Sequence, residues 1–181
     1  MDSLNKVGPA LFKEEQRFSV TLFVIPMLLI TLFATYIIIN GMYKQLVEGI
    51  PWGNRPMSNS TLKVVGPLIL ALIWGVFYLF FYMRLIVVVG ENALLIHFRP
   101  LVKKIIEYNK IQSCEAVEYR PIREFGGWGI RFRAGEVAYT VSGTRGVRLE
   151  LKEGKKILIG SHQPERLANE IKTRLTKATI S

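Results

Sequence analysis

The sequence predicts a membrane-anchored α+β protein, in which two N-terminal transmembrane helices precede an antiparallel β-sandwich or barrel closed by a C-terminal helix. Three observations lead to this class. The chain of 181 residues contains two long uncharged runs in its N-terminal half. Short β-rich segments separated by turns follow these runs, and an amphipathic pattern with helical spacing ends the chain. Because no helices alternate with the strands, the pattern argues against a parallel α/β sheet.

The two uncharged runs extend from Phe18 to Tyr43 and from Val64 to Met83. About 20 apolar residues cross a hydrocarbon core of ~30 Å as a helix. We therefore expect transmembrane helices over residues 18–43 and 62–83. The first run is longer than the apolar region of a signal peptide, which spans about 7–15 residues, and a second run follows it. We interpret it as an anchor that is retained.

The segments beside the two spans have simpler predictions. Residues 1–17 are expected to form a short amphipathic segment, with a helix from Pro9 to Arg17 that lies on the membrane; a frayed terminus is the alternative. Residues 44–61 are rich in glycine and proline, which predicts an extracytoplasmic loop of turns rather than a domain. Within the second span, Ala71 and Gly75 are four residues apart and small enough to let the two helices approach closely.

Basic residues are more frequent outside the loop than within it. The positive-inside rule therefore predicts that both termini are cytoplasmic and that the protein resides in an inner or plasma membrane. The residues that carry this prediction are Lys6, Lys13, Arg17, Arg84, Arg99, Lys103 and Lys104 on the cytoplasmic side, against Lys44 and Arg55 in the loop.

Residues 84–181 are expected to form the cytoplasmic domain. Alternating or β-branched runs bounded by turns predict its strands. Ala134-Gly135 and Glu153-Gly154 are expected to be the turns of two hairpins, and a helix from Pro164 has Leu167, Ile171 and Leu175 on one apolar stripe. The expected strands are residues 84–89, 93–98, 103–108, 110–120, 128–133, 136–141, 146–151 and 155–160.

The stretch REFGGWGIRF, residues 123–132, combines three glycines with one tryptophan. It has neither the lysine nor the following helix of a Walker A phosphate loop. We interpret Gly126 and Gly127 as the turn that leads into a strand, and Gly126, Gly127, Trp128 and Gly129 together as a structural motif. From the alternation of the strand, Trp128, Ile130 and Phe132 are expected to face the core, with Trp128 at its edge. A tryptophan that faces the bilayer or a partner is the alternative.

The sequence shows no catalytic, metal-binding or cofactor-binding pattern. His97 and His162 are distant in sequence and belong to no ligand-spacing motif. The single cysteine, Cys114, lies in an expected strand and is interpreted as a buried structural thiol. No serine stands in a nucleophile motif. We therefore expect no enzyme activity and no cofactor.

The net charge of +10 is concentrated in the C-terminal domain, where 18 Lys and Arg stand against 10 Asp and Glu from Arg84 onward. A basic domain tethered to a membrane is attracted to an anionic leaflet. A solvated basic face without a ligand is the alternative, and the absence of nucleic-acid-binding motifs argues against DNA or RNA. The candidate residues that face the membrane or a partner are Arg84, Arg99, Lys103, Lys104, Arg120, Arg123, Arg131 and Arg133.

The runs REFGGWGIRF, AYTVSGTRGVRLEL and GKKILIGSHQPERLANEI resemble those of bacterial two-span membrane proteins with a PH-like (pleckstrin-homology-like) domain, a family of unknown function. The resemblance covers residues 84–177. It implies a PH-like fold and a membrane anchor, and it implies no catalytic residue.

These observations predict a membrane-anchored interaction or scaffold protein that presents a basic PH-like domain at the cytoplasmic membrane face within a larger assembly. The expected partners are membrane lipids and either another protein or further copies of the chain. An anionic-lipid-headgroup-binding module and an assembly factor for a membrane complex are the alternatives.

Overall fold

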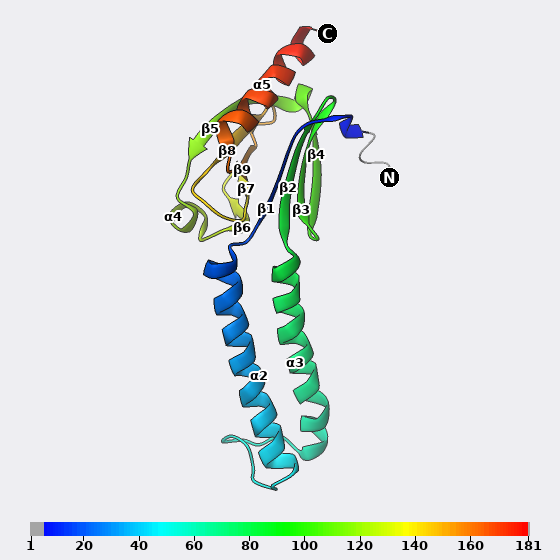
Figure 1. Cartoon of the computed structure of the whole chain (residues 1–181), viewed down its shortest axis with the longest axis vertical. Coiled ribbons are helices and arrows are strands. Elements are labelled where there is room, and N and C mark those ends of the chain that lie inside the picture. Colours follow the sequence, from blue (N-terminus) through cyan, green and yellow to red (C-terminus); the bar gives the residue numbers. More distant parts are fainter. Residues whose placement is uncertain (1–5, 181) are drawn as a thin grey trace. The chain divides into compact units, whose positions relative to one another are not determined.

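The computed structural model describes residues 6–180 and confirms the α+β class (Figure 1). The chain divides into two compact units. The described residues of Met1–Arg17 and Met83–Ser181 form the β unit, and Phe18–Tyr82 form the helical unit. In chain order the elements are β1 (Ala10–Arg17), a π-helix (Val20–Val24), α2 (Ile25–Leu46), α3 (Asn59–Tyr82), β2 (Arg84–Gly90), β3 (Ala93–Arg99), β4 (Val102–Glu107), a 3-10 helix (Tyr108–Lys110), β5 (Ile111–Glu118), α4 (Pro121–Phe125), β6 (Gly129–Arg133), β7 (Glu136–Thr140), β8 (Arg145–Leu151), β9 (Lys156–Gly160) and α5 (Pro164–Ile180).

The helical unit contains two helices that are long and apolar enough to cross a membrane, Val20–Leu46 and Asn59–Tyr82. Most of their apolar side chains are exposed, unlike those of a core helix in a water-soluble domain. Pro26 lies in the first turn of α2, directly after the π-helix Val20–Val24.

The two helices contact each other through residues other than the predicted pair. Ala71 and Gly75 are both exposed, and the space beside Gly75 is open. The expectation that these residues mediate the close approach is therefore wrong. Instead, Gly66 of α3 is covered by the Met42 side chain, and the Trp74 indole donates a 3.1 Å hydrogen bond to the Thr35 hydroxyl. Small residues are present on more than one face of α3, and the rotation of the helix about its axis decides which face is used.

The connecting loop is held by one buried amide. Gln45, near the end of α2, donates to the Met57 carbonyl at 2.6 Å and accepts from the Trp52 amide at 3.2 Å. The Trp52 ring covers Gly41, so that any side chain at this glycine would overlap the indole. The glycine- and proline-rich loop is thus a set of turns packed on α2, in agreement with its composition.

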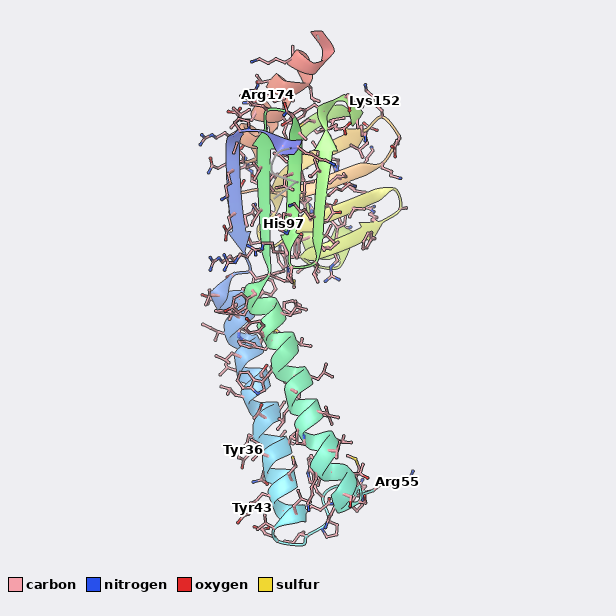
Figure 2. The ribbon with its side chains drawn as sticks, turned by 90° about the vertical axis from the view of Figure 1, so that its right-hand side faces the viewer. Tyr36, Tyr43, Arg55, His97, Lys152 and Arg174 are labelled. Atoms are coloured by element: carbon pink, nitrogen blue, oxygen red, sulfur yellow. The ribbon has the colours of Figure 1, made fainter. Side chains whose placement is uncertain are left out.

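The β unit contains two sheets. The first sheet is antiparallel, with the order β1-β2-β3-β4, and the second has the order β5-β8-β9-β7-β6. Figure 2 shows the strands of the first sheet in front of those of the second, with His97 on the outer face of the first sheet. Both predicted hairpins, β6–β7 and β8–β9, are present. The expectation of a fully antiparallel arrangement is nevertheless wrong for the second sheet. In that sheet, β7 of one hairpin pairs in parallel with β9 of the other.

The prediction of an N-terminal helix from Pro9 to Arg17 is wrong, because Ala10–Arg17 forms the strand β1. Its side chains alternate between exposed and buried, and the strand pairs with β2 from Ala10 to Arg17. The segment is amphipathic with the period of a strand. Two of its inward residues, Glu14 and Gln16, are polar, which conceals this period in the sequence.

The inner faces of the two sheets and one face of α5 supply the core of the β unit. Leu167 and Ile171 of the predicted stripe are fully buried and Ala168 joins them, whereas Leu175 is half-buried. The helix covers β5 and β8, and the Cys114 thiol of β5 lies 3.9 Å from the Ala168 carbonyl oxygen. This packing fixes the C-terminal helix over one open side of the sheets.

Candidate functional site

Three arginines stand side by side at one end of the first sheet. Arg17, Arg84 and Arg99 are register partners on the neighbouring strands β1, β2 and β3. Cross-strand partners in an antiparallel sheet point to the same face with their Cβ atoms about 5 Å apart. The row therefore places three guanidinium groups on the outer face, at the end where β1 ends and β2 begins.

The carboxylate of Glu15 contacts two of these arginines. Glu15 accepts a 2.9 Å hydrogen bond from Arg84 and lies 3.6 Å from Arg17. The hydrogen bond from Arg84 lowers the pKa of Glu15, and this effect outweighs the smaller, opposite effect of partial burial. Arg99 forms no ion pair among the residues described. The row consequently retains a net positive charge at neutral pH.

The other predicted basic residues fall into separate places. Lys103 lies beside His97 on the outer face of the first sheet, one row further from the end. Lys104 is half-buried and faces the second sheet, because its partner Ile96 belongs to the inner face. Adjacent residues of a strand point to opposite faces, so these two lysines lie on opposite faces of the first sheet.

Two further arginines border a short helix that the sequence analysis missed. Arg120 precedes α4 and Arg123 lies within it, and both are exposed. The α4 helix folds over the outer face of the second sheet, where Tyr119 and Phe125 pack on Ala138 and Leu158. A proline at the first helical position and a glycine after the last were the available sequence signals.

Arg131 and Arg133 lie on the outer face of β6, the edge strand of the second sheet. Both serve local contacts. Arg131 donates to the Trp128 carbonyl at 3.1 Å, and Arg133 lies 3.9 Å from the Glu124 carboxylate of α4. Glu124 also lies 4.0 Å from Arg148, which forms a 2.7 Å ion pair with Glu136. This group of charges ties α4 to the sheet beneath it.

The glycine motif forms a turn between α4 and β6. Gly126 ends α4 in the left-handed conformation at φ 71°, and its N–H donates to the Ile122 carbonyl. The half-buried Trp128 donates from its indole nitrogen to the Gly143 carbonyl at 2.8 Å, which joins this turn to the one between β7 and β8. The motif thus links two turns of the second sheet.

The expectation that Phe132 enters the core is wrong, because its side chain is 79% exposed. It occupies the inner side of β6, as the alternation requires, but β6 is an edge strand that lacks cover on this side. Apart from Leu11 at 36% on β1, two other large apolar side chains of the described β unit are exposed, Leu101 at 54% in the turn between β3 and β4 and Ile122 at 70% on α4.

These apolar residues belong to the same end of the β unit as the arginine row. Leu101 follows Arg99 closely in the chain. A series of hydrogen bonds connects the end of β1 with α4: Gln16 bonds to Gly160, the amide of Ser161 to Arg145, and the amide of Tyr119 to Thr144. Figure 1 shows α4 and β6 at the end of the β unit where β1 ends, whereas the C-terminal part of α5 lies at the opposite end.

A buried carboxylate lies behind the row. Glu14 is 7% exposed and accepts three hydrogen bonds, from the Ser161 hydroxyl (2.6 Å), the His162 amide (2.7 Å) and the Gln16 side chain (3.0 Å). It connects the strand before the first membrane-length helix to the start of α5. This site was not predicted from the sequence, since its only local signal is the polar inward residues of β1, a strand that was predicted as a helix.

Within residues 6–180, no three His, Cys, Asp or Glu side chains cluster as metal ligands. Burial raises the pKa of the Cys114 thiol to about 12, which leaves it protonated and unreactive. Partial burial, followed by the charges of Lys103 and Arg99, lowers the pKa of His97.

The chain was compared with protein-family models, with curated proteins and with solved structures, and none of them matches it.

Proposed function

We propose that this protein is a membrane-anchored interaction protein that presents its β unit at the cytoplasmic membrane face. The observation that carries the proposal is the connection between the units: β1 leads into one helix long enough to cross a membrane, and the adjacent strand β2 follows directly after the other. Because two neighbouring strands at one end connect the β unit to these helices, only a few residues separate it from the bilayer. This tether suits a protein that holds partners at a membrane.

The β unit is proposed to be a PH-like domain. Two facing sheets followed by a C-terminal helix that covers one open side support this assignment, together with the resemblance of residues 84–177. The arginine-rich end and the burial of Cys114 favour binding over covalent chemistry as the role of the domain. The expected partners are a second protein or further copies of this chain, alongside the lipids.

The topology is tested with two single-cysteine reporters on exposed sites, Arg55→Cys in the loop and Lys152→Cys in the β unit (Figure 2). The native Cys114 is buried and remains silent. In intact cells, a membrane-impermeant maleimide should label position 55 at once and position 152 only after the membrane is opened. Equal labelling of both positions in intact cells, or recovery of the protein without membranes, contradicts the anchored topology.

The interaction role is tested on the full chain purified in nanodiscs after chemical cross-linking in the membrane. We expect a defined stoichiometric complex, either with one other protein or between copies. A lone monomer in native mass spectrometry, with no reproducible cross-linked species, contradicts the role while leaving the topology intact.

A further inference from the structure

We propose that the end of the β unit that carries the arginine row docks directly on the surface of an anionic bilayer. The docking face comprises Arg17, Arg84, Arg99, Leu101, Ile122 and Phe132. The inference rests on the proposed membrane anchor and assigns a second membrane contact to the β unit itself. Besides the predicted Arg84 and Arg99, the docking face includes Arg17, which was not among the predicted candidates, and three apolar residues.

The charge of this face matches lipid phosphate. The Arg17–Arg84–Arg99 row follows the sheet end, and only Glu15 offsets it among the ion pairs described. Guanidinium groups bind phosphate oxygens in a bidentate manner. Arg120, just before α4, and Arg123, within it, are exposed and extend the positive charge around the same end.

The exposed apolar side chains favour contact of this face with a bilayer over exposure of the face to water. Large apolar side chains that are at least one-third exposed in the described β unit are Leu11, Leu101, Ile122 and Phe132. All except Leu11 belong to the docking face. Scattered exposed apolar residues are ordinary, but apolar side chains bordered by arginines form the pattern of an interfacial membrane contact. Leu101, Ile122 and Phe132 are expected to insert between headgroups.

Chain length identifies the occupant as the bilayer to which the protein is anchored. Arg17 is three residues before Val20, the first residue of the first membrane-length helix, and Arg84 is two residues after Tyr82, the last residue of the second. A chain extends by at most ~3.6 Å per residue, so both arginines lie within about 11 Å of the ends of the spans. The headgroup layer is roughly 5–8 Å thick on each side of the hydrocarbon core. The row is therefore confined to the depth of the phosphates or just beyond it.

The experiment measures lipid contact at two matched sites of the full chain in nanodiscs. An environment-sensitive fluorophore is attached to Phe132→Cys on the docking face or to Lys152→Cys in the turn between β8 and β9. Lys152 is exposed and bonds through its amide to Lys110, at the end of the β unit opposite to the row. Nanodiscs contain phosphatidylcholine alone or a 7:3 mixture with phosphatidylglycerol, each with a trace of lipid that carries a quencher near the headgroup.

We expect quenching at position 132 and none at position 152, with stronger quenching in the anionic nanodiscs. Each of the changes Arg17→Gln, Arg84→Gln and Arg99→Gln should lower the ratio of docked to undocked protein about fivefold, and 0.5 M salt should do the same in part. Lys110→Gln, at the opposite end, is the control and should have no effect.

Equal quenching at positions 132 and 152, or quenching at 132 that ignores lipid charge and the three arginines, overturns the proposal. A label at 132 that is shielded from water without lipid quenching, and only in nanodiscs that hold two copies, assigns the face to a second copy and also overturns it. A protein that leaves the nanodiscs contradicts the anchor, whereas an anchored protein with an unquenched label contradicts the docking face alone.

Discussion

The carboxylate of Glu14 accepts a 2.6 Å hydrogen bond from the hydroxyl of Ser161, 147 positions later in the chain. The same hydroxyl accepts from the amide of Gln163 at 3.0 Å, just before α5 begins at Pro164. The strand that leads into the first membrane-length helix is thereby fixed to the start of the C-terminal helix. This contact gives the run IGSHQPERL a structural role.

Loss of the Glu14 carboxylate should destabilise the β unit. Glu14→Ala leaves the Ser161 hydroxyl and the His162 amide without their acceptor, and a buried hydrogen bond to a charged group is worth about 1.5–3 kcal/mol. We expect a decrease of about 2–4 kcal/mol in the free energy of unfolding, measured by denaturant titration of the nanodisc-bound protein.

The matched control for this prediction is Glu15→Gln, one residue later on the exposed face of the same strand. Its ion pairs are at the surface, so its effect should be less than about 1 kcal/mol. A double-mutant cycle of Glu14→Ala with Ser161→Ala should give clearly non-additive effects. Additive effects, or equal losses for Glu14 and Glu15, would show that the buried network does not stabilise the fold.

Cys114 should report the docking of α5. Burial raises the pKa of its thiol to about 12, and the helix lies over it through Ala168. The thiolate is the reactive form, so maleimide should modify the native protein only when this region opens. We expect rapid labelling in denaturant and slow labelling without it. Ala168→Gly, which weakens the helix by about 1 kcal/mol, should accelerate labelling, whereas Ala134→Gly in the exposed turn between β6 and β7 should leave the rate unchanged. Fast native labelling at neutral pH would contradict a buried Cys114.

His97 should titrate below its ordinary pKa of about 6.5. Partial burial disfavours its charged form, and the charges of Lys103 and Arg99 add to this effect. A pKa that is lower in the folded state gives a stability contribution that is present above about pH 6.5 and is lost as the pH falls through the folded-state value. NMR titration of histidine-labelled protein measures this pKa, with His162→Gln to assign the signals.

Removal of a nearby charge tests the cause of the shift at His97. Lys103→Gln should move the pKa of His97 back toward its ordinary value, and His97→Gln should flatten the dependence of stability on pH below about 6.5. Lys152→Gln, at the opposite end of the β unit, should leave the titration unchanged. A His97 pKa at or above 6.5 in the wild-type protein would contradict the environment described here.

Gly126 should resist replacement for a reason of backbone conformation alone. A Cβ atom there would meet open space, but the residue adopts φ 71° at the end of α4. Gly126→Ala should therefore destabilise the unit by about 1 kcal/mol, and Gly126→Asn by less, because asparagine tolerates the left-handed region. Thermal unfolding monitored through Cys114 reactivity compares the two. If alanine is tolerated better than asparagine, the left-handed turn is not required.

Most elements of this protein could be predicted from the sequence because their signals are local. Charge-free runs determined the two membrane-length helices. Strands β2 to β9 followed from alternation and turn residues, since each pattern is complete within about ten residues. The apolar stripe of Leu167 and Ile171 identified the face of α5 in the same way.

Only the tertiary structure decided which of these elements meet. The strand β1 was predicted as a helix because its inward residue Glu14 is polar, which conceals the period of a strand. The residues that bind Glu14, Ser161 and His162, have no local relation to it in the sequence. The whole helical unit separates β1 from β2 in the sequence, yet the two strands pair. This pairing brings Arg17 beside Arg84 and so creates the arginine row. Phe132 is exposed because β6 is the last strand of its sheet, and strand order depends on long-range pairing that no local pattern encodes.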